Sequence, residues 1–143
     1  MNNRSPASAP SPSLKTASDP FMAAARRAVL EGATEPPFSS PLNQEGRAGL
    51  YSCAGCGAPL YKSSAKFPTS CGWPGFTQGT EGAIATRADH SHNMTRTEIH
   101  CARCGGHLGH VFDDGPTAQE HPEGTTMRHC VNGLALDFTP SGA

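Results

Sequence analysis

Six cysteines are the residues of this 143-residue chain whose type and spacing carry the most chemistry. Four of them form two CxxC motifs, Cys53-Ala-Gly-Cys56 and Cys101-Ala-Arg-Cys104, and a glycine follows each motif directly. A CxxC turn aims two sulfurs at one ion, and the glycine relieves the backbone strain of that turn. Four thiolates make the tetrahedral set that zinc prefers and leave no open coordination position. The spacing therefore predicts a structural zinc site.

Other uses of these four cysteines are two local disulfides, a redox-active CxxC or an iron–sulfur cluster. A thioredoxin-like motif needs its CxxC at the start of a helix in a βαβ unit, whereas both motifs here are flanked by strand-like sequence and glycine. We expect no secretory segment, which leaves a disulfide framework with little support. An iron–sulfur cluster fits the ligand type and is less favoured than zinc. Residues 57–100 separate the motifs, so the metal would clamp distant strands.

The two remaining cysteines, Cys71 and Cys130, have surroundings that favour reactivity. Arg128 and His129 precede Cys130 and are expected to lower the pKa of its thiol, which favours the nucleophilic thiolate. Cys71 begins the segment CGWPGF, where Trp73 follows in a rigid turn. Such a thiol suits a binding wall or a resolving cysteine. Two buried and inert thiols are the alternative interpretation, because free cysteine is often buried.

All seven histidines fall within residues 90–129. His107 and His110 have the spacing of metal ligands, so a histidine-rich zinc site competes with an acid–base role near the nucleophile and with an ordinary core position. The segment HPE at 121–123 resembles the HxE element of zinc deaminases. A deaminase also needs a following PCxxC motif, which the sequence lacks, so this interpretation fails.

Residues 1–18 are rich in serine, proline, alanine and asparagine and have almost nothing to bury, so they are expected to form a disordered tail. A transit peptide is the alternative for this segment, and a cytoplasmic location is otherwise expected. Residues 19–143 are expected to form one domain. An N-terminal helix is predicted to have Asp19 as N-cap and Pro20 as its first residue and to end at Gly32. Its expected apolar stripe comprises Phe21, Ala24, Ala25 and Val29.

Short β-like runs between turns dominate from residue 49 onward. The best strand candidates are residues 49–53, 59–62, 95–101, 108–112 and 131–138. The last run places Leu134, Leu136 and Phe138 on one face. Helical patterns do not alternate with these runs, which disfavours a parallel α/β sheet. The sequence predicts a mainly antiparallel β-domain with an N-terminal helix.

Composition excludes some functions. The chain has no apolar run of 18 residues, so a membrane-spanning helix is not expected. Its net charge of −1 argues against a nucleic-acid partner. A zinc-ribbon interaction module stays an alternative, but it leaves Cys71 and Cys130 unexplained. A cysteine hydrolase that uses Cys130 with a histidine is a second alternative.

Five motifs in order resemble the B-type methionine sulfoxide reductases, which reduce the R epimer of methionine sulfoxide. These are TEPPF at 34–38, CAGCGAPLY at 53–61, CGWPGF at 71–76, MTRTEIHCARCGGHLGHVFDDGP at 94–116 and RHCVN at 128–132. The resemblance covers about residues 20–138. It implies a mainly β fold in which two antiparallel sheets form a tent-like, partly open barrel. FPTSC before the resolving position, the glycine after GWP, the long stretch 115–127 and Gly133 depart from the common pattern, and none of them removes a reactive group.

The resemblance implies a role for each matching residue. Cys130 would be the catalytic nucleophile and Cys71 the resolving cysteine. Trp73 would wall a pocket for the ε-methyl group of the substrate, and His110, rather than His107, would protonate the sulfoxide oxygen. The residues implied to orient or polarise the site are Asp114, Arg128 and Asn132, and those implied to line the pocket are His92 and Glu98. One structural zinc (Zn2+) per chain would be held by Cys53, Cys56, Cys101 and Cys104.

The implied reaction runs through a sulfenic acid on Cys130 and a Cys71–Cys130 disulfide, which thioredoxin would reduce. The implied substrates are oxidised proteins or free methionine sulfoxide, and the chain is expected to act as a monomer without nucleic acid or membrane partners.

Overall fold

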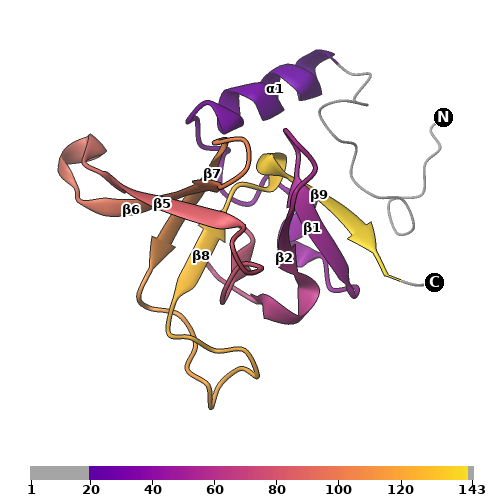
Figure 1. Cartoon of the computed structure of the whole chain (residues 1–143), viewed down its shortest axis with the longest axis vertical. Coiled ribbons are helices and arrows are strands. Elements are labelled where there is room, and N and C mark those ends of the chain that lie inside the picture. The colour runs from indigo at the N-terminus through magenta and orange to yellow at the C-terminus, as the bar shows by residue number, and fades with distance from the viewer. Residues whose placement is uncertain (1–19, 142–143) are drawn as a thin grey trace.

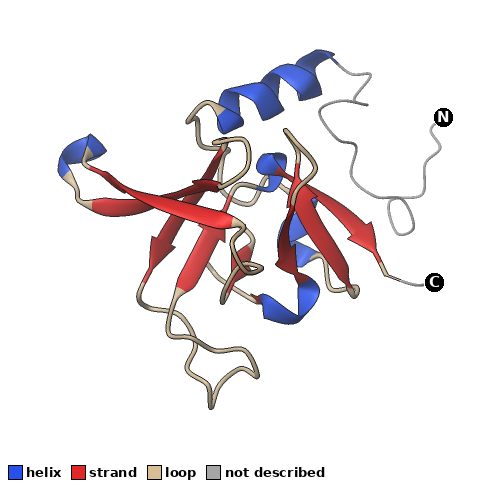
Figure 2. Cartoon of the chain, in the orientation of Figure 1, coloured by secondary structure: helices blue, strands red, loops and turns tan. Residues whose placement is uncertain are grey.

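A computed structural model gives the structure of the protein and describes residues 20–141, apart from the side chain of His92. Two antiparallel sheets make up the described part, and the helix α1 (Pro20–Leu30) lies against one end of them (Figures 1 and 2). One sheet has three strands in the order β2-β1-β9, and the other has six in the order β3-β4-β8-β7-β6-β5. The predicted mainly antiparallel β fold with an N-terminal helix is confirmed.

The strands are short, as the turn-rich sequence predicts. They are β1 (Gly49–Cys53), β2 (Pro59–Lys62), β3 (Lys66–Phe67), β4 (Gly75–Phe76), β5 (Ile84–Asp89), β6 (Arg96–Cys101), β7 (His107–Phe112), β8 (Arg128–Val131) and β9 (Leu136–Pro140). The described residues also form four 3₁₀ turns, of which the first precedes β1 and the others connect strands, namely η1 (Pro41–Gln44), η2 (Ser63–Ala65), η3 (Ser91–Asn93) and η4 (Gly133–Ala135).

An aromatic core holds the two sheets together. The Tyr51 and Phe138 rings of the three-stranded sheet are 4.7 Å apart, and Phe76 of the six-stranded sheet packs on both tyrosines of the other sheet. The Phe76 ring centroid lies 5.0 Å from that of Tyr51 and 4.3 Å from that of Tyr61. All four rings are at most 1% exposed. Burial of such rings is the main stabilising contribution that this sequence offers to sheet packing.

The prediction of one continuous strand over residues 131–138 is wrong, because this segment is divided between two strands. The chain leaves the six-stranded sheet at Val131, turns through η4 and enters the three-stranded sheet at Leu136. Both residues are fully buried, but in different sheets. Residues on both sides of the crossover are apolar and buried, so the pattern of apolar residues did not indicate that the strand is interrupted.

The predicted apolar stripe of the helix is also partly wrong. Phe21 is 86% exposed, and the residues of α1 that are buried are Val29 and the cation Arg26. The Arg26 guanidinium donates hydrogen bonds to the carbonyl oxygens of Leu134 (3.0 Å) and Leu136 (3.2 Å). Leu134 lies in η4 and Leu136 begins β9, so the buried arginine supplies hydrogen-bond donors where the chain crosses from one sheet to the other. The helix begins at Pro20 as predicted, while the predicted N-cap Asp19 and the tail 1–18 lie outside the described residues.

Within residues 20–141, no helix combines the length and the apolar character that crossing a membrane requires.

Candidate functional site

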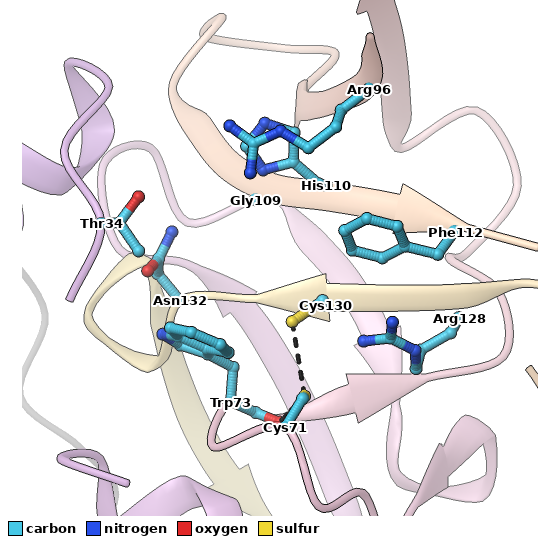
Figure 3. A pocket seen from close by; sticks show the side chains of 10 residues that line it. All are labelled: Thr34, Cys71, Trp73, Arg96, Gly109, His110, Phe112, Arg128, Cys130 and Asn132. Atoms are coloured by element: carbon cyan, nitrogen blue, oxygen red, sulfur yellow. Dashed lines mark hydrogen bonds between the residues drawn. The ribbon is translucent and has the colours of Figure 1, made fainter. Parts of the chain in front are cut away.

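A small pocket opens where the turn before β4, the strands β7 and β8 and the segment after α1 meet. Its volume is about 200 Å³. Figure 3 shows its lining, which consists of Thr34, Cys71, Trp73, Arg96, Gly109, His110, Phe112, Arg128, Cys130 and Asn132. Six of the nine residues predicted for the reactive site line this pocket, namely Cys71, Trp73, His110, Arg128, Cys130 and Asn132.

The two cysteines outside the CxxC motifs meet in this pocket. The Sγ atoms of Cys71 and Cys130 are 3.6 Å apart, and both thiols are free (Figure 3). Cys130 lies on β8, and β4, which pairs with β8, carries the turn that contains Cys71. Gly72 makes this turn possible, because its φ is +98° and a Cβ atom there would lie 2.6 Å from Pro37. The sequence segment CGWP therefore places one thiol directly against the other.

Strand register sets the opposite wall of the pocket. In the β7–β8 pair, His110 lies opposite Cys130 and Phe112 lies opposite Arg128. Residues two apart on a strand share a face, so one acid–base group, one ring, one cation and one thiol all point to the same side. The Arg128 guanidinium packs 4.5 Å from the Phe112 ring centroid. Arg128 also donates two hydrogen bonds to the Asp114 carboxylate, at 2.8 and 3.2 Å.

Arg128 and His129 were both expected to lower the pKa of Cys130, and for His129 this expectation is wrong. His129 pairs with Val111 in the register and faces the other side of β8, where its Nδ1 is 3.0 Å from the Tyr61 hydroxyl. Burial lowers the pKa of His129 to about 4, so the ring is neutral and offers no charge to the thiol. Adjacent residues on a strand point to opposite faces, and neighbours in sequence are for that reason poor electrostatic partners.

The Cys130 thiol is protonated at neutral pH in the absence of substrate. Burial and the neighbouring Cys71 raise its pKa to about 12, and the nearby Arg128 charge opposes that rise only in part. Burial also works against ionisation of Cys71, but its contacts with Thr69 and the Trp73 backbone leave the Cys71 pKa below the ordinary value. Of the two thiols, Cys71 ionises first.

This order of ionisation predicts an order of alkylation. At pH 8, iodoacetamide should modify Cys71 at least about tenfold faster than Cys130, because the thiolate is the reacting species and its fraction falls about tenfold for each unit by which the pKa exceeds the pH. Peptide mapping by mass spectrometry after short exposures measures both rates in one sample. Faster modification of Cys130 than of Cys71 would contradict this assignment.

Glu35 holds two walls of the pocket in place and was not predicted from the sequence. Its carbonyl oxygen accepts a hydrogen bond from the Trp73 indole (3.0 Å), and its amide donates to the Asn132 side-chain oxygen (3.0 Å). Its own carboxylate accepts from the Leu134 amide at 2.8 Å and is buried. Asn132 in turn donates to the Leu108 carbonyl at 2.9 Å. Backbone hydrogen bonds of this kind leave no pattern in the sequence.

His110 forms a close pair with a carboxylate that was also not predicted. Its Nε2 lies 2.7 Å from Oδ2 of Asp89, the last residue of β5. Arg96 lies beside it and reaches the same oxygen at 3.4 Å. Thr34, Arg96, Gly109 and Phe112 complete the lining and were missed. Gly109 and Phe112 are the first and last residues of the run GHVF, and strand alternation from His110 would have indicated Phe112.

Two predicted residues do not line the pocket, and the structure does not describe the side chain of a third. Glu98 is buried and pairs with His107 (2.5 Å) and with Arg87 (2.8 Å). Asp114 is outside the lining and touches it through Arg128. The backbone of His92 lies in η3, and the prediction for its side chain falls outside what the structure describes.

The four CxxC cysteines gather into one cluster that fits a tetrahedral metal ion. Their sulfur atoms all lie within 4.8 Å of one another, with Sγ–Sγ distances of 3.7 Å for Cys53–Cys104 and 3.6 Å for Cys56–Cys101. Sulfurs bound at about 2.3 Å in a tetrahedron would be about 3.8 Å apart. The alternative of two local disulfides is not what the structure has, because all of these thiols are free and each close pair joins different motifs.

The two cysteine turns are built alike, and each belongs to a different sheet. Cys53 ends β1 of the three-stranded sheet, and Cys101 ends β6 of the six-stranded sheet. Gly57 and Gly105 have φ values of +82° and +79° and donate their amides to the Cys53 and Cys101 carbonyls at 2.8 Å. Only glycine adopts this conformation without strain, as the motif predicts. A bound ion would thus join the two sheets at the end covered by α1 (Figure 1).

The sequence of this chain was compared with family models and with known proteins. The family model described as the SelR domain matches residues 22–140. The chain belongs to the SelR-domain family. A relative from Bradyrhizobium diazoefficiens, named peptide methionine sulfoxide reductase MsrB, is 51% identical over 115 residues, which cover 79% of this chain and 78% of that protein. Proteins of the same name from Agrobacterium fabrum and Variovorax paradoxus are 46% and 47% identical, over 78% and 80% of this chain and 79% and 81% of their own length. The family indicated by the five sequence motifs is confirmed.

Proposed function

We propose that this chain reduces the R epimer of methionine sulfoxide, in proteins or free, to methionine, with Cys130 as nucleophile and Cys71 as resolving cysteine. The observation that carries the proposal is the 3.6 Å separation of the Cys71 and Cys130 sulfurs inside the pocket. A disulfide needs its sulfurs about 2.05 Å apart, so a movement of roughly 1.5 Å joins them. The SelR-domain relatives, named as methionine sulfoxide reductases, support the same chemistry.

The proposed first step transfers one oxygen atom. The Cys130 thiolate attacks the sulfoxide sulfur while the His110 imidazolium protonates the oxygen, and the products are methionine, neutral His110 and a sulfenic acid on Cys130. Because burial keeps Cys130 protonated beforehand, its proton must pass to water as substrate binds, and the Arg128 charge favours that loss. Thiolate chemistry suits this step because sulfur accepts oxygen reversibly.

The proposed second step removes the oxygen as water. The Cys71 thiol attacks the sulfenic sulfur, which forms the Cys71–Cys130 disulfide and releases one water molecule. The lowered pKa of Cys71 supplies the attacking thiolate. A dithiol reductant of the thioredoxin class then exchanges with the disulfide and restores both thiols.

We propose zinc as the ion of the four-cysteine cluster, with Cys53, Cys56, Cys101 and Cys104 as its ligands. A zinc ion with four thiolate ligands supplies a cross-link and no reaction chemistry, because no coordination position is open. The proposed catalytic unit is the single domain predicted over residues 19–143.

An assay that resolves the two epimers tests the proposal. Purified protein with dithiothreitol should convert free and peptide-bound methionine (R)-sulfoxide to methionine and leave the S epimer unchanged. Replacement of dithiothreitol by thioredoxin, its reductase and NADPH should support the same turnover. Reduction of the S epimer alone, or of neither epimer, would reject the proposed function.

Trp73→Ala tests the proposed methyl-binding wall. Removal of the indole should lower kcat/KM for the R epimer on the order of 10–100-fold, because the ring contributes apolar contact area and fixes the position of the reacting sulfur. Steady-state kinetics with a peptide substrate measure the effect. Trp73→Phe is the matched control that keeps a ring but loses the bond to Glu35, and it should retain most of the activity. Equal loss in both variants would assign the effect to the hydrogen bond instead.

A further inference from the structure

The pair formed by His110 and Asp89 determines which nitrogen of the imidazole faces the reaction. Oδ2 of Asp89 lies 2.7 Å from Nε2 of His110, and the other Asp89 oxygen accepts a hydrogen bond from the Ser91 amide at 3.0 Å. These hydrogen bonds, above all the one with His110, hold the pKa of Asp89 well below its ordinary value, so the carboxylate is ionised. An ionised carboxylate only accepts hydrogen bonds. Nε2 therefore carries a proton in both the neutral and the charged form of His110.

The other nitrogen of His110 is left for the substrate. Apart from the side chain of His92, which the structure does not describe, no group of residues 20–141 forms a hydrogen bond with Nδ1 of His110, and the ring lines the pocket opposite Cys130. Asp89 is outside the lining and touches the pocket through His110 and Arg96. Figure 3 shows the His110 and Arg96 side chains together on the wall of the pocket that faces Cys71 and Trp73.

Other ionisable groups around His110 do not make this contact. On β6, Arg96 binds Asp89 itself, and Glu98 is bonded to Arg87 and His107. The His107 ring on β7 lies 5.6 Å from the His110 ring, centroid to centroid. On β8, Cys130 is opposite His110, and Arg128 is bonded to Asp114. Among the described residues, Asp89 is thus the carboxylate that holds this histidine.

We propose that Asp89 is a positioning residue that keeps the proton of His110 on Nε2, stabilises the imidazolium and so presents Nδ1–H to the sulfoxide oxygen. This inference rests on the proposed function. In the proposed step the Nδ1 proton passes to the oxygen as Cys130 attacks the sulfur, and neutral His110 with Nε2–H remains and regains a proton from water. A carboxylate partner that fixes the tautomer and favours the charged ring is a general device for orienting catalytic histidines.

Asp89→Asn tests this assignment through the pH profile of kcat/KM for the R epimer. The variant should lose about 10–100-fold in kcat/KM near neutral pH. The shape of its pH profile should change, because asparagine does not supply the negative charge that lies beside the His110 ring in the wild type. Asp89→Glu keeps the charge and should recover part of the loss. Asp113→Asn removes an exposed carboxylate from the turn after β7 and is the matched control, with an unchanged profile expected.

Nitrogen-15 NMR of the histidine rings supplies a readout that does not depend on activity. In the wild-type full chain, neutral His110 should be the Nε2–H tautomer. A neutral Nδ1–H tautomer in the wild type would overturn the inference even if the variant failed to fold. An Asp89→Asn profile identical to that of the wild type would also overturn it. Absence of R-epimer turnover by the wild type would instead reject the proposed function, which keeps the two failures distinct.

Discussion

Replacement of Cys130 by serine will abolish reduction of methionine (R)-sulfoxide, with a loss of about 10⁴-fold or more in kcat. The substitution keeps the size of the side chain, but a hydroxyl is scarcely ionised at neutral pH and does not form the oxygen-carrying intermediate that sulfur forms. Because Cys130 is half-buried at a strand position where serine fits, the fold should survive. The epimer-resolved assay with dithiothreitol measures the loss, and thermal unfolding confirms that the variant is folded.

Cys71→Ser is the matched control, because it removes the other thiol of the same pair. This variant should produce about one methionine per chain in a single turnover and then stop when thioredoxin is the only reductant. Substantial turnover by Cys130→Ser would move the nucleophile to another residue. Full thioredoxin-dependent cycling by Cys71→Ser would show that Cys71 does not resolve the sulfenic acid.

Loss of the metal-binding cluster should have the second large effect, on stability. Cys56→Ser removes one of four ligands that join the two sheets, and a structural zinc contributes a large part of the folding free energy of a small domain. We expect the free energy of unfolding to fall by about 3–5 kcal/mol and Tm by ~10–20 °C. Thermal unfolding followed by circular dichroism, with metal content measured by mass spectrometry, tests this expectation.

The same measurement on Cys71→Ser distinguishes the effect of losing a metal ligand from the effect of losing any partly buried cysteine. Cys71 is also partly buried but lies outside the cluster, so its variant should keep the bound metal and melt within a few degrees of the wild type. If wild-type protein purified with all four thiols free contains no metal, or if Cys56→Ser melts like the wild type, the cluster does not hold a structural ion.

The sequence predicted the parts of the site that depend on short-range motifs. The CxxC spacing and the following glycines indicated the four-cysteine cluster, and the family motifs brought Cys71 and Cys130 together before the fold was known. The strand pattern located β1, β2, β6 and β7 to within about a residue. These features follow from local turn geometry and from alternation, both of which a sequence displays directly.

Long-range contacts explain what the sequence did not predict. Asp89 reaches His110 only because β5, β6 and β7 lie side by side, and no residue of β5 is fully buried, so the strand shows no clear alternation of apolar and polar residues. Glu35 acts mainly through its backbone atoms, which are identical in every residue type. The expected effect of His129 on Cys130 failed because strand alternation points the two side chains to opposite faces.

The most direct test of the account is a single-turnover experiment on wild-type protein whose thiols have been reduced and separated from reductant. One equivalent of methionine (R)-sulfoxide is added, methionine is quantified, and disulfides are mapped by mass spectrometry after acid quench and alkylation. We predict about one methionine and one Cys71–Cys130 disulfide per chain, with the four CxxC cysteines still outside any disulfide. Methionine formed without this disulfide, or with a disulfide that involves a CxxC cysteine, would contradict the account.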